Sequence, residues 1–200
     1  MPKIVDHALR RQQVVDALWR IIDRDGIGAV SIRALAREAG VPRATAAYYF
    51  DGRADLLFTA MQTSMQRSLD RVKQFNFDEG GVEPFIKAFW EAVPLTAKRR
   101  KQTGVWLALV SEAQHDNEVM SLLASTDAEF REYVIHFLEM MDDRGLLKSD
   151  VDITLIADEL HALIDGLALH TMTDPKAVPP NRLKAVLVDW ANRVTVDQSR

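Results

Sequence analysis

Cysteine is absent from the 200 residues of the sequence. This excludes a disulfide framework, a thiolate-bound zinc ion and a thiol nucleophile, and it suits a reducing compartment. Long apolar runs are also missing: the longest, 105–110, is far shorter than the roughly 18 residues that a membrane-spanning helix needs. The first residues lack the apolar centre of a signal peptide. We therefore expect no membrane association and a cytoplasmic location.

Charge is spread unevenly along a chain whose composition is otherwise ordinary. Apolar residues make up 48% and charged residues 27%, as in folded globular proteins, and the net charge is −4. Residues 1–56 nevertheless carry nine Lys or Arg against seven Asp or Glu, and arginine supplies eight of these nine cations. The remainder of the chain is acidic. We therefore expect the N-terminal part, and not the rest, to face phosphate groups.

Apolar residues recur at three- and four-residue spacing almost throughout, and no segment alternates with a period of two. The pattern predicts an all-α fold. We expect an N-terminal domain over 1–52 and a longer helical domain over 53–200, which the helix near 53–73 connects. The other expected helices lie near 7–25, 31–39, 42–48, 84–93, 98–110, 117–144, 152–172 and 180–194.

Two short predicted helices follow a longer one in the arginine-rich part of the chain. Gly40 stands where the first short helix ends, Pro42 stands where the second begins, and Val41 fills the space between them. Small residues, Ala36 and Ala39, allow the two helices to cross closely. This layout is typical of a helix-turn-helix, whose second helix enters the major groove of DNA. The side chains that can reach phosphates or base edges are Arg33, Arg43, Thr45, Tyr48, Tyr49 and Arg53.

The run SIRALAREAGVPRATAAYYF, preceded by VVDA and followed by RADLL, resembles the DNA-binding domain of TetR-family transcriptional regulators. The resemblance implies that Arg43 and Thr45 lie on the recognition helix, that Tyr48 contacts phosphate, and that Arg53 replaces a phosphate-binding lysine. Larger residues are usual in the family at Ala46 and Ala47, and histidine at Tyr49, so base preference does not carry over. The candidate DNA-binding residues are Ser31, Arg33, Pro42, Arg43, Thr45, Tyr48, Tyr49 and Arg53.

The last two predicted helices are the candidates for a dimer interface, because helix-turn-helix proteins usually read paired half-sites as dimers. We expect a four-helix interface to which two chains contribute equally. In the alternative, both apolar stripes face the core of their own protomer. The two stripes are Ile153, Ile156, Leu160, Leu163 and Leu167, and Leu183, Val186, Leu187, Trp190 and Val194.

TetR-like regulators generally hold a small-molecule pocket between the DNA-binding and dimerising helices. The resemblance therefore implies that 1–52 is the helix-turn-helix domain and that 53–200 is a helical effector-binding and dimerisation domain. The candidate ligand-binding residues are Phe89, Trp90, Trp106, Glu112, Tyr133 and Phe137. Segments 105–116 and 163–167 are also similar to the C-terminal region of choline-responsive repressors of glycine-betaine synthesis. A tryptophan face with Glu112 would suit a quaternary ammonium ion, but the ligand class stays open. The resemblance implies a repressor that releases a palindromic operator when a small molecule binds, with no cofactor, no metal ion and no catalytic residue.

A rival hypothesis is a metal-dependent helical-bundle enzyme. Glu112 and His115, and likewise Asp158 and His161, are three residues apart, as in di-iron carboxylate bundles. Such a site needs two further acids, and Glu91 and Glu139 are the candidates. This spacing arises readily by chance in a chain with twenty-nine acidic residues and five histidines. A third hypothesis is a helical scaffold that does not contact DNA.

Overall fold

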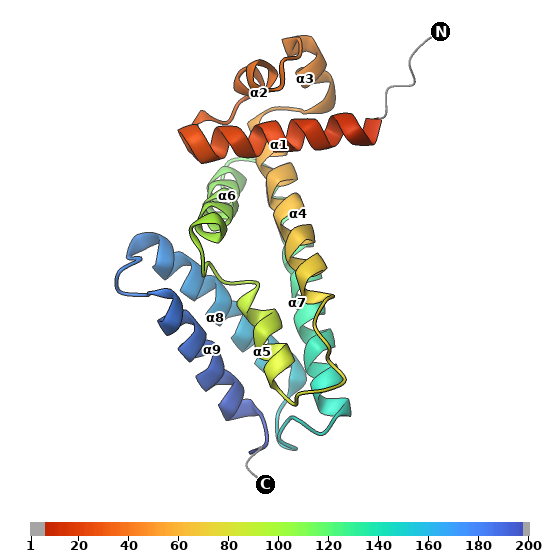
Figure 1. The fold of residues 1–200 in the computed structure, drawn as a ribbon, viewed down its shortest axis with the longest axis vertical. Coiled ribbons are helices and arrows are strands. Elements are labelled where there is room, and N and C mark those ends of the chain that lie inside the picture. Colours follow the sequence, from red (N-terminus) through yellow and green to blue (C-terminus); the bar gives the residue numbers. More distant parts are fainter. Residues whose placement is uncertain (1–6, 198–200) are drawn as a thin grey trace. The chain divides into compact units, whose positions relative to one another are not determined.

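The computed structural model describes the backbone of residues 7–197 and the side chains of residues 13–197. Over this range the chain forms nine α-helices and one 3-10 turn, with no strand and a single isolated bridge between Leu147 and Thr195. The all-α prediction is confirmed. No helix within 7–197 combines the length and the apolar character that crossing a bilayer demands. The elements are α1 (His7–Asp25), η1 (Ile27–Ala29), α2 (Ile32–Ala39), α3 (Arg43–Tyr49), α4 (Arg53–Val72), α5 (Glu83–Trp90), α6 (Ala97–Ala113), α7 (Asn117–Asp143), α8 (Ile153–Thr173) and α9 (Pro180–Val194) (Figure 1).

The helices begin and end where local chemistry dictates. Ser31 precedes α2, and its hydroxyl accepts a hydrogen bond from the Ala34 N–H at 3.2 Å. Gly40 ends α2 with φ of 66°, a left-handed conformation that residues with a side chain rarely adopt. The Val41 N–H then donates to the Ala36 carbonyl at 3.0 Å, which closes the turn. Asp152 caps α8 in the same way as Ser31 caps α2.

The chain forms two compact units. The first comprises residues up to 66 together with 104–120, and the second comprises 67–103 together with the residues from 121 onward. Helices α4, α6 and α7 contribute residues to both units. The functional division into 1–52 and 53–200 is a different division and stays a prediction.

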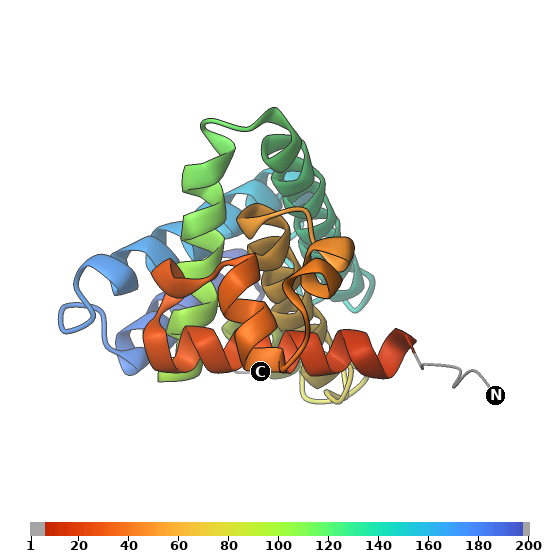
Figure 2. The same ribbon diagram turned by 90° about the horizontal axis from the view of Figure 1, so that it is seen from above.

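In the first unit, α1 packs on α2 and α2 on α3. Figures 1 and 2 show α2 and α3 as two consecutive short helices on one side of α1. The packing is apolar: Leu18 and Ile21 of α1 are buried, as are Leu35 of α2 and Leu56 and Leu57 of α4. Burial of each such side chain contributes roughly 1.5–3 kcal/mol. The short helices therefore depend on α1 for their positions.

In the second unit, α9 packs against both α5 and α8 (Figure 1). Trp190 of α9 lies at the centre of this core with no exposed surface. Its ring meets Phe89 of α5 edge to face, with the centroids 5.9 Å apart. Other fully buried residues of this core are Phe85 of α5, Leu138 and Met141 of α7, and Ala157 and Leu160 of α8.

The apolar stripes of α8 and α9 line this core, which agrees with the alternative that they face their own protomer, and a dimer interface through the last two helices stays a prediction. Ile153, Leu163 and Leu167 pack partly buried against the core, and Val186 is also half-buried. A regular apolar spacing marks the buried face of a helix but does not say what covers it. Outward-facing apolar residues of α8 are instead Leu155, Leu169 and Met172. The stripe residues that the protomer itself buries are Ile156, Leu160, Leu183, Leu187, Trp190 and Val194.

Replacing Trp190 by alanine removes the largest fully buried side chain. We expect the free energy of unfolding to fall by about 3–5 kcal/mol, because the core cannot collapse to fill the space. Urea denaturation measures this change. Leu122→Ala, at an exposed position of α7, is the control and changes stability by less than about 0.5 kcal/mol. Equal stability of the two variants would contradict the described core.

Candidate nucleic-acid interface

Helix α3 presents most of its surface to solvent. Pro42 precedes it with φ of −58°, a value that its ring fixes, and both Pro42 and Arg43 are exposed. Only Ala46 is buried among the seven helical residues. Because Ala46 has a small side chain, α3 packs close to α2 and still leaves its outer face free. Within the first unit, the segment from Pro42 onward is therefore not sealed beneath other helices.

Two tyrosines end α3. Tyr48 is 82% exposed and Tyr49 is 39% exposed, and their rings meet edge to face with centroids 5.2 Å apart. Thr45 is half-buried. Phe50, directly after the helix, is buried and fixes this end of α3 to the rest of the first unit. The tyrosine rings thus stand at the surface on a short element that is held at its base.

The surface at the start of α2 can bind an anion. Ser31, Arg33, Ala34 and Arg37 line an open depression of about 170 Å³. The first N–H groups of a helix and its dipole attract negative charge, and Arg33 and Arg37 are exposed beside them. This depression suits a phosphate oxygen.

The arginines of the first unit divide into two sets. Arg20 and Arg24 of α1 each donate to Glu38 of α2 at 2.9 Å, and these hydrogen bonds hold the pKa of Glu38 below its usual range. They join α1 to α2. Arg33 and Arg43, in contrast, form no ion pair with any side chain within 13–197. Their charge is therefore available to an external anion.

Arg53 begins α4 and forms an ion pair with Glu112 of α6. Its guanidinium also donates to the Ile27 carbonyl at 3.4 Å. Arg53 was a candidate phosphate ligand and Glu112 a candidate effector ligand, and the structure brings these two side chains together within the first unit. In this ion pair the charge of each side chain is balanced by the charge of the other. The contact could not be predicted from the sequence, because Arg53 and Glu112 lie far apart along the chain.

The candidate effector residues do not form one cluster. Phe89 is buried and Phe137 half-buried in the core of the second unit, with ring centroids 6.3 Å apart. Tyr133 is 43% exposed on α7. Trp106 is half-buried and belongs, like Glu112, to the first unit. Their roles in ligand binding stay predictions.

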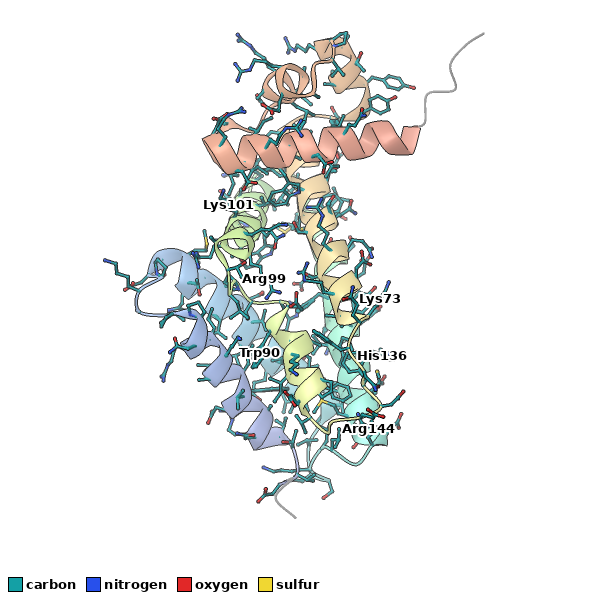
Figure 3. The ribbon with its side chains drawn as sticks, viewed as in Figure 1. Lys73, Trp90, Arg99, Lys101, His136 and Arg144 are labelled. Atoms are coloured by element: carbon teal, nitrogen blue, oxygen red, sulfur yellow. The ribbon has the colours of Figure 1, made fainter. Side chains whose placement is uncertain are left out.

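Trp90, at the end of α5, lies among cations. The Lys184 ammonium sits over its ring, 4.5 Å from the centroid. Its carbonyl accepts a hydrogen bond from Arg99 at 2.9 Å, and Figure 3 labels both residues. The neighbouring Glu91 pairs with both Arg71 and Arg99. The indole N–H of Trp90 is buried without a hydrogen-bond partner among the described residues. One face of the Trp90 ring thus already holds a cation.

Most of the residues proposed for a di-iron site either pair with arginine or are exposed. Arg53 engages Glu112, and Arg131 engages Asp158 at 2.5 Å, which lowers the pKa of Asp158. Glu91 is paired as described above, and His115 and Glu139 are exposed.

Another set of metal-binding residue types does converge. It is the only such group within 13–197, and it consists of Asp127, His161 and Asp165. Burial raises the pKa of Asp165; the His161 imidazole opposes this shift and the Asp127 charge adds to it. Sequence reasoning missed Asp127 and Asp165, although Asp165 follows His161 by one helical turn.

Comparison with known proteins agrees with this geometry. Residues 14–60 match the tetR family of bacterial regulatory proteins, and residues 87–195 match the C-terminal domain of BetI-type transcriptional repressors. The chain belongs to the TetR family. It is 33% identical over 201 residues to the transcriptional regulator PksA of Bacillus subtilis, covering 100% of this chain and 97% of PksA. It is 27% identical over 196 residues to BetI of Vibrio vulnificus, covering 96% of each.

Solved structures of TetR-type regulators share the fold. A putative transcriptional regulator from Saccharomonospora viridis in complex with choline superposes with a TM-score of 0.77 at 21% identity, covering 96% of this chain and 100% of that one. A TetR regulator from Haloarcula marismortui gives 0.78 at 17% identity, over 94% and 100% of the two chains. With the helix-turn-helix, the family identifies a ligand-responsive, DNA-binding transcriptional regulator. Its relatives are regulators of transcription rather than enzymes.

The contact between Arg53 and Glu112 can be tested by a double-mutant cycle. We expect Arg53→Gln and Glu112→Gln to lower the free energy of unfolding by non-additive amounts, with a coupling energy of about 0.2–1 kcal/mol because both side chains are partly exposed. Urea denaturation of the two single variants and the double variant measures it. Glu118→Gln, at an exposed position of α7, replaces Glu112→Gln in the control cycle and shows no coupling. Strict additivity in the first cycle would show that the pair does not exist in solution.

Proposed function

We propose that this regulator is a homodimeric repressor. It binds a palindromic operator through α3 and the start of α2, and it dissociates from the operator when a small molecule binds. The observation that carries the proposal is the exposure of α3, with Arg43 and Tyr48 at the surface and only Ala46 buried. Because α3 buries only Ala46, its outer face is free to contact a partner, and we propose that this partner is DNA.

The side chains of this surface divide by what they can contact. Ser31 and Arg33 lie at the depression at the start of α2, where backbone N–H groups favour a phosphate. Tyr48 adds a hydroxyl suited to a second phosphate, with Tyr49 beside it. Arg43 and Thr45 lie in the first turn of α3 after Pro42, and arginine there can read the two acceptors of guanine. Phosphate contacts would position the protein and Arg43 would specify sequence.

Two copies of α3 are needed to read a palindrome, because half-sites lie about 34 Å apart along DNA. The outer face of α8 supports the dimer. Leu155, Ala162 and Leu169 are exposed and seven residues apart, so they follow one side of the helix. Met172 extends this face. We propose that the face pairs with its copy, together with α9, in place of the buried stripes.

Arg53 and Glu112 supply a route from effector to operator. As long as Glu112 holds Arg53, the guanidinium is not free for phosphate. Helix α6 contributes residues to both units, so an effector that shifts α6 changes this pairing. An effector that binds more tightly to the conformer with the weaker DNA contact lowers operator affinity by the ratio of its two affinities.

The choline bound to the Saccharomonospora viridis regulator does not by itself indicate the effector of this chain. A quaternary ammonium site needs an aromatic face and an unpaired acid. Here Lys184 covers Trp90, and arginines already bind Glu91 and Glu112. We propose that neither Trp90 nor Glu112, each already paired within its own unit, serves as a cation site.

Operator binding tests the proposed surface. We expect Arg43→Ala to reduce affinity for DNA fragments selected from a random pool by about 1–3 kcal/mol, and Tyr48→Phe to weaken binding without relaxing sequence preference. Fluorescence anisotropy over a range of salt concentrations measures both. Lys73→Ala, which removes an exposed cation directly after α4, is the matched control. Wild-type affinity in Arg43→Ala, or affinity that does not depend on salt, would favour a scaffold that does not contact DNA.

The dimer surface is tested by placing a charge on it. Leu169→Glu would put two like charges into an apolar contact, and we expect the protein to sediment as a monomer and to lose most of its operator affinity. Analytical ultracentrifugation gives the oligomeric state. Leu122→Glu, at an exposed leucine of α7, should stay dimeric. A dimeric Leu169→Glu protein would move the interface to another face.

A further inference from the structure

Two helices of the second unit bring an imidazole and two carboxylates together. His161 and Asp165 lie one turn apart on α8, so they share a face, and Asp127 approaches from α7. The Nε2 atom of His161 lies 3.2 Å from Oδ1 of Asp127 and 3.8 Å from Oδ2 of Asp165. The three potential ligand atoms all lie within 4.8 Å of one another.

Neighbouring side chains hold His161 in place, and no arginine or lysine of the described residues pairs with the two carboxylates. The His161 side chain is only 13% exposed, and the Phe130 ring meets it edge to face with centroids 4.9 Å apart. Arg131 of α7 instead binds Asp158, to which its Nε and Nη2 donate at 2.5 and 3.1 Å. No lysine or arginine within 13–197 pairs with Asp127 or Asp165.

The separations match those around a small metal ion. A tetrahedral ion with bonds of about 2.0–2.2 Å holds its ligand atoms about 3.4 Å apart. The two distances from Nε2 fall on either side of this value, so small side-chain adjustments would complete the triangle. One imidazole nitrogen with two carboxylate oxygens suits a divalent first-row transition ion, and three protein ligands leave one position for water.

We propose that Asp127, His161 and Asp165 bind a divalent transition-metal ion that links α7 to α8. From the sequence alone we expected no metal ion. This site also differs from the rival di-iron hypothesis, which paired His161 with Asp158. The ion would fix the side of α8 that faces α7. The proposal does not depend on operator binding or on the identity of the effector.

Metal titration of the full-length protein, freed of metal with a chelator, tests the site. The probes are Co²⁺, whose visible absorption reports tetrahedral coordination, and Zn²⁺, followed by calorimetry. We expect one ion per chain. Asp127→Asn and His161→Gln should each weaken binding by at least about 10- to 100-fold, which is the loss typical for disturbing even the groups that orient metal ligands. His136→Gln, an exposed histidine of α7, is the matched control and should bind as the wild type does.

A thermal measurement keeps the test decisive if His161→Gln folds poorly. Asp127 is exposed, so Asp127→Asn should keep the fold by circular dichroism. Zn²⁺ should raise the thermal midpoint of the wild type and of His136→Gln, and leave that of Asp127→Asn unchanged. Wild-type affinity in Asp127→Asn, or no uptake of either ion by the wild-type chain, would overturn the proposal and leave His161 as the partner of two carboxylates only.

Discussion

The packing of α2 against α1 is the constraint on which the DNA-binding surface depends. Helix α3 has seven residues and buries only Ala46, and an isolated helix of that length is not stable in water. Its position comes from the left-handed turn at Gly40 and from Phe50, which anchors its far end. Because these supports lie at its base, the outer face of α3 contributes little to stability and is free to carry Arg43 and Tyr48.

The same packing decides which arginines remain available. Arg20 and Arg24 converge on Glu38, so the cations closest to α1 serve to join two helices. Arg33 and Arg43 stand where no acid of the described chain reaches them. A chain of net charge −4 can therefore present a positive surface to DNA. The distribution of ion pairs matters here more than the total charge.

Local signals predicted most of the fold. Ser31, Gly40 and Asp152 mark helix ends through short-range hydrogen bonds and backbone conformation, and residues 14–57 resemble a known domain, so these features were within reach. The burial of Leu160 and Trp190 was misread because an apolar stripe looks the same whether it faces its own core or a partner. The pairing of Arg53 with Glu112, and of Asp127 with His161, joins distant segments. No short-range pattern records such contacts.

The magnitude of the contact between Arg53 and Glu112 limits what it can do in allostery. A partly exposed ion pair contributes about 0.2–1 kcal/mol, so one such pair changes an equilibrium by at most about fivefold. In a dimer two copies act together, and up to about 2 kcal/mol corresponds to roughly a 30-fold change, within the usual range of allosteric coupling. Breaking or making both pairs would thus shift operator affinity by a useful amount only if the two subunits change together. In the proposed mechanism, Arg53 and Glu112 would bias a concerted change of α4 and α6. Leu56 and Leu57 are fully buried, and such a change would have to repack the side chains around them.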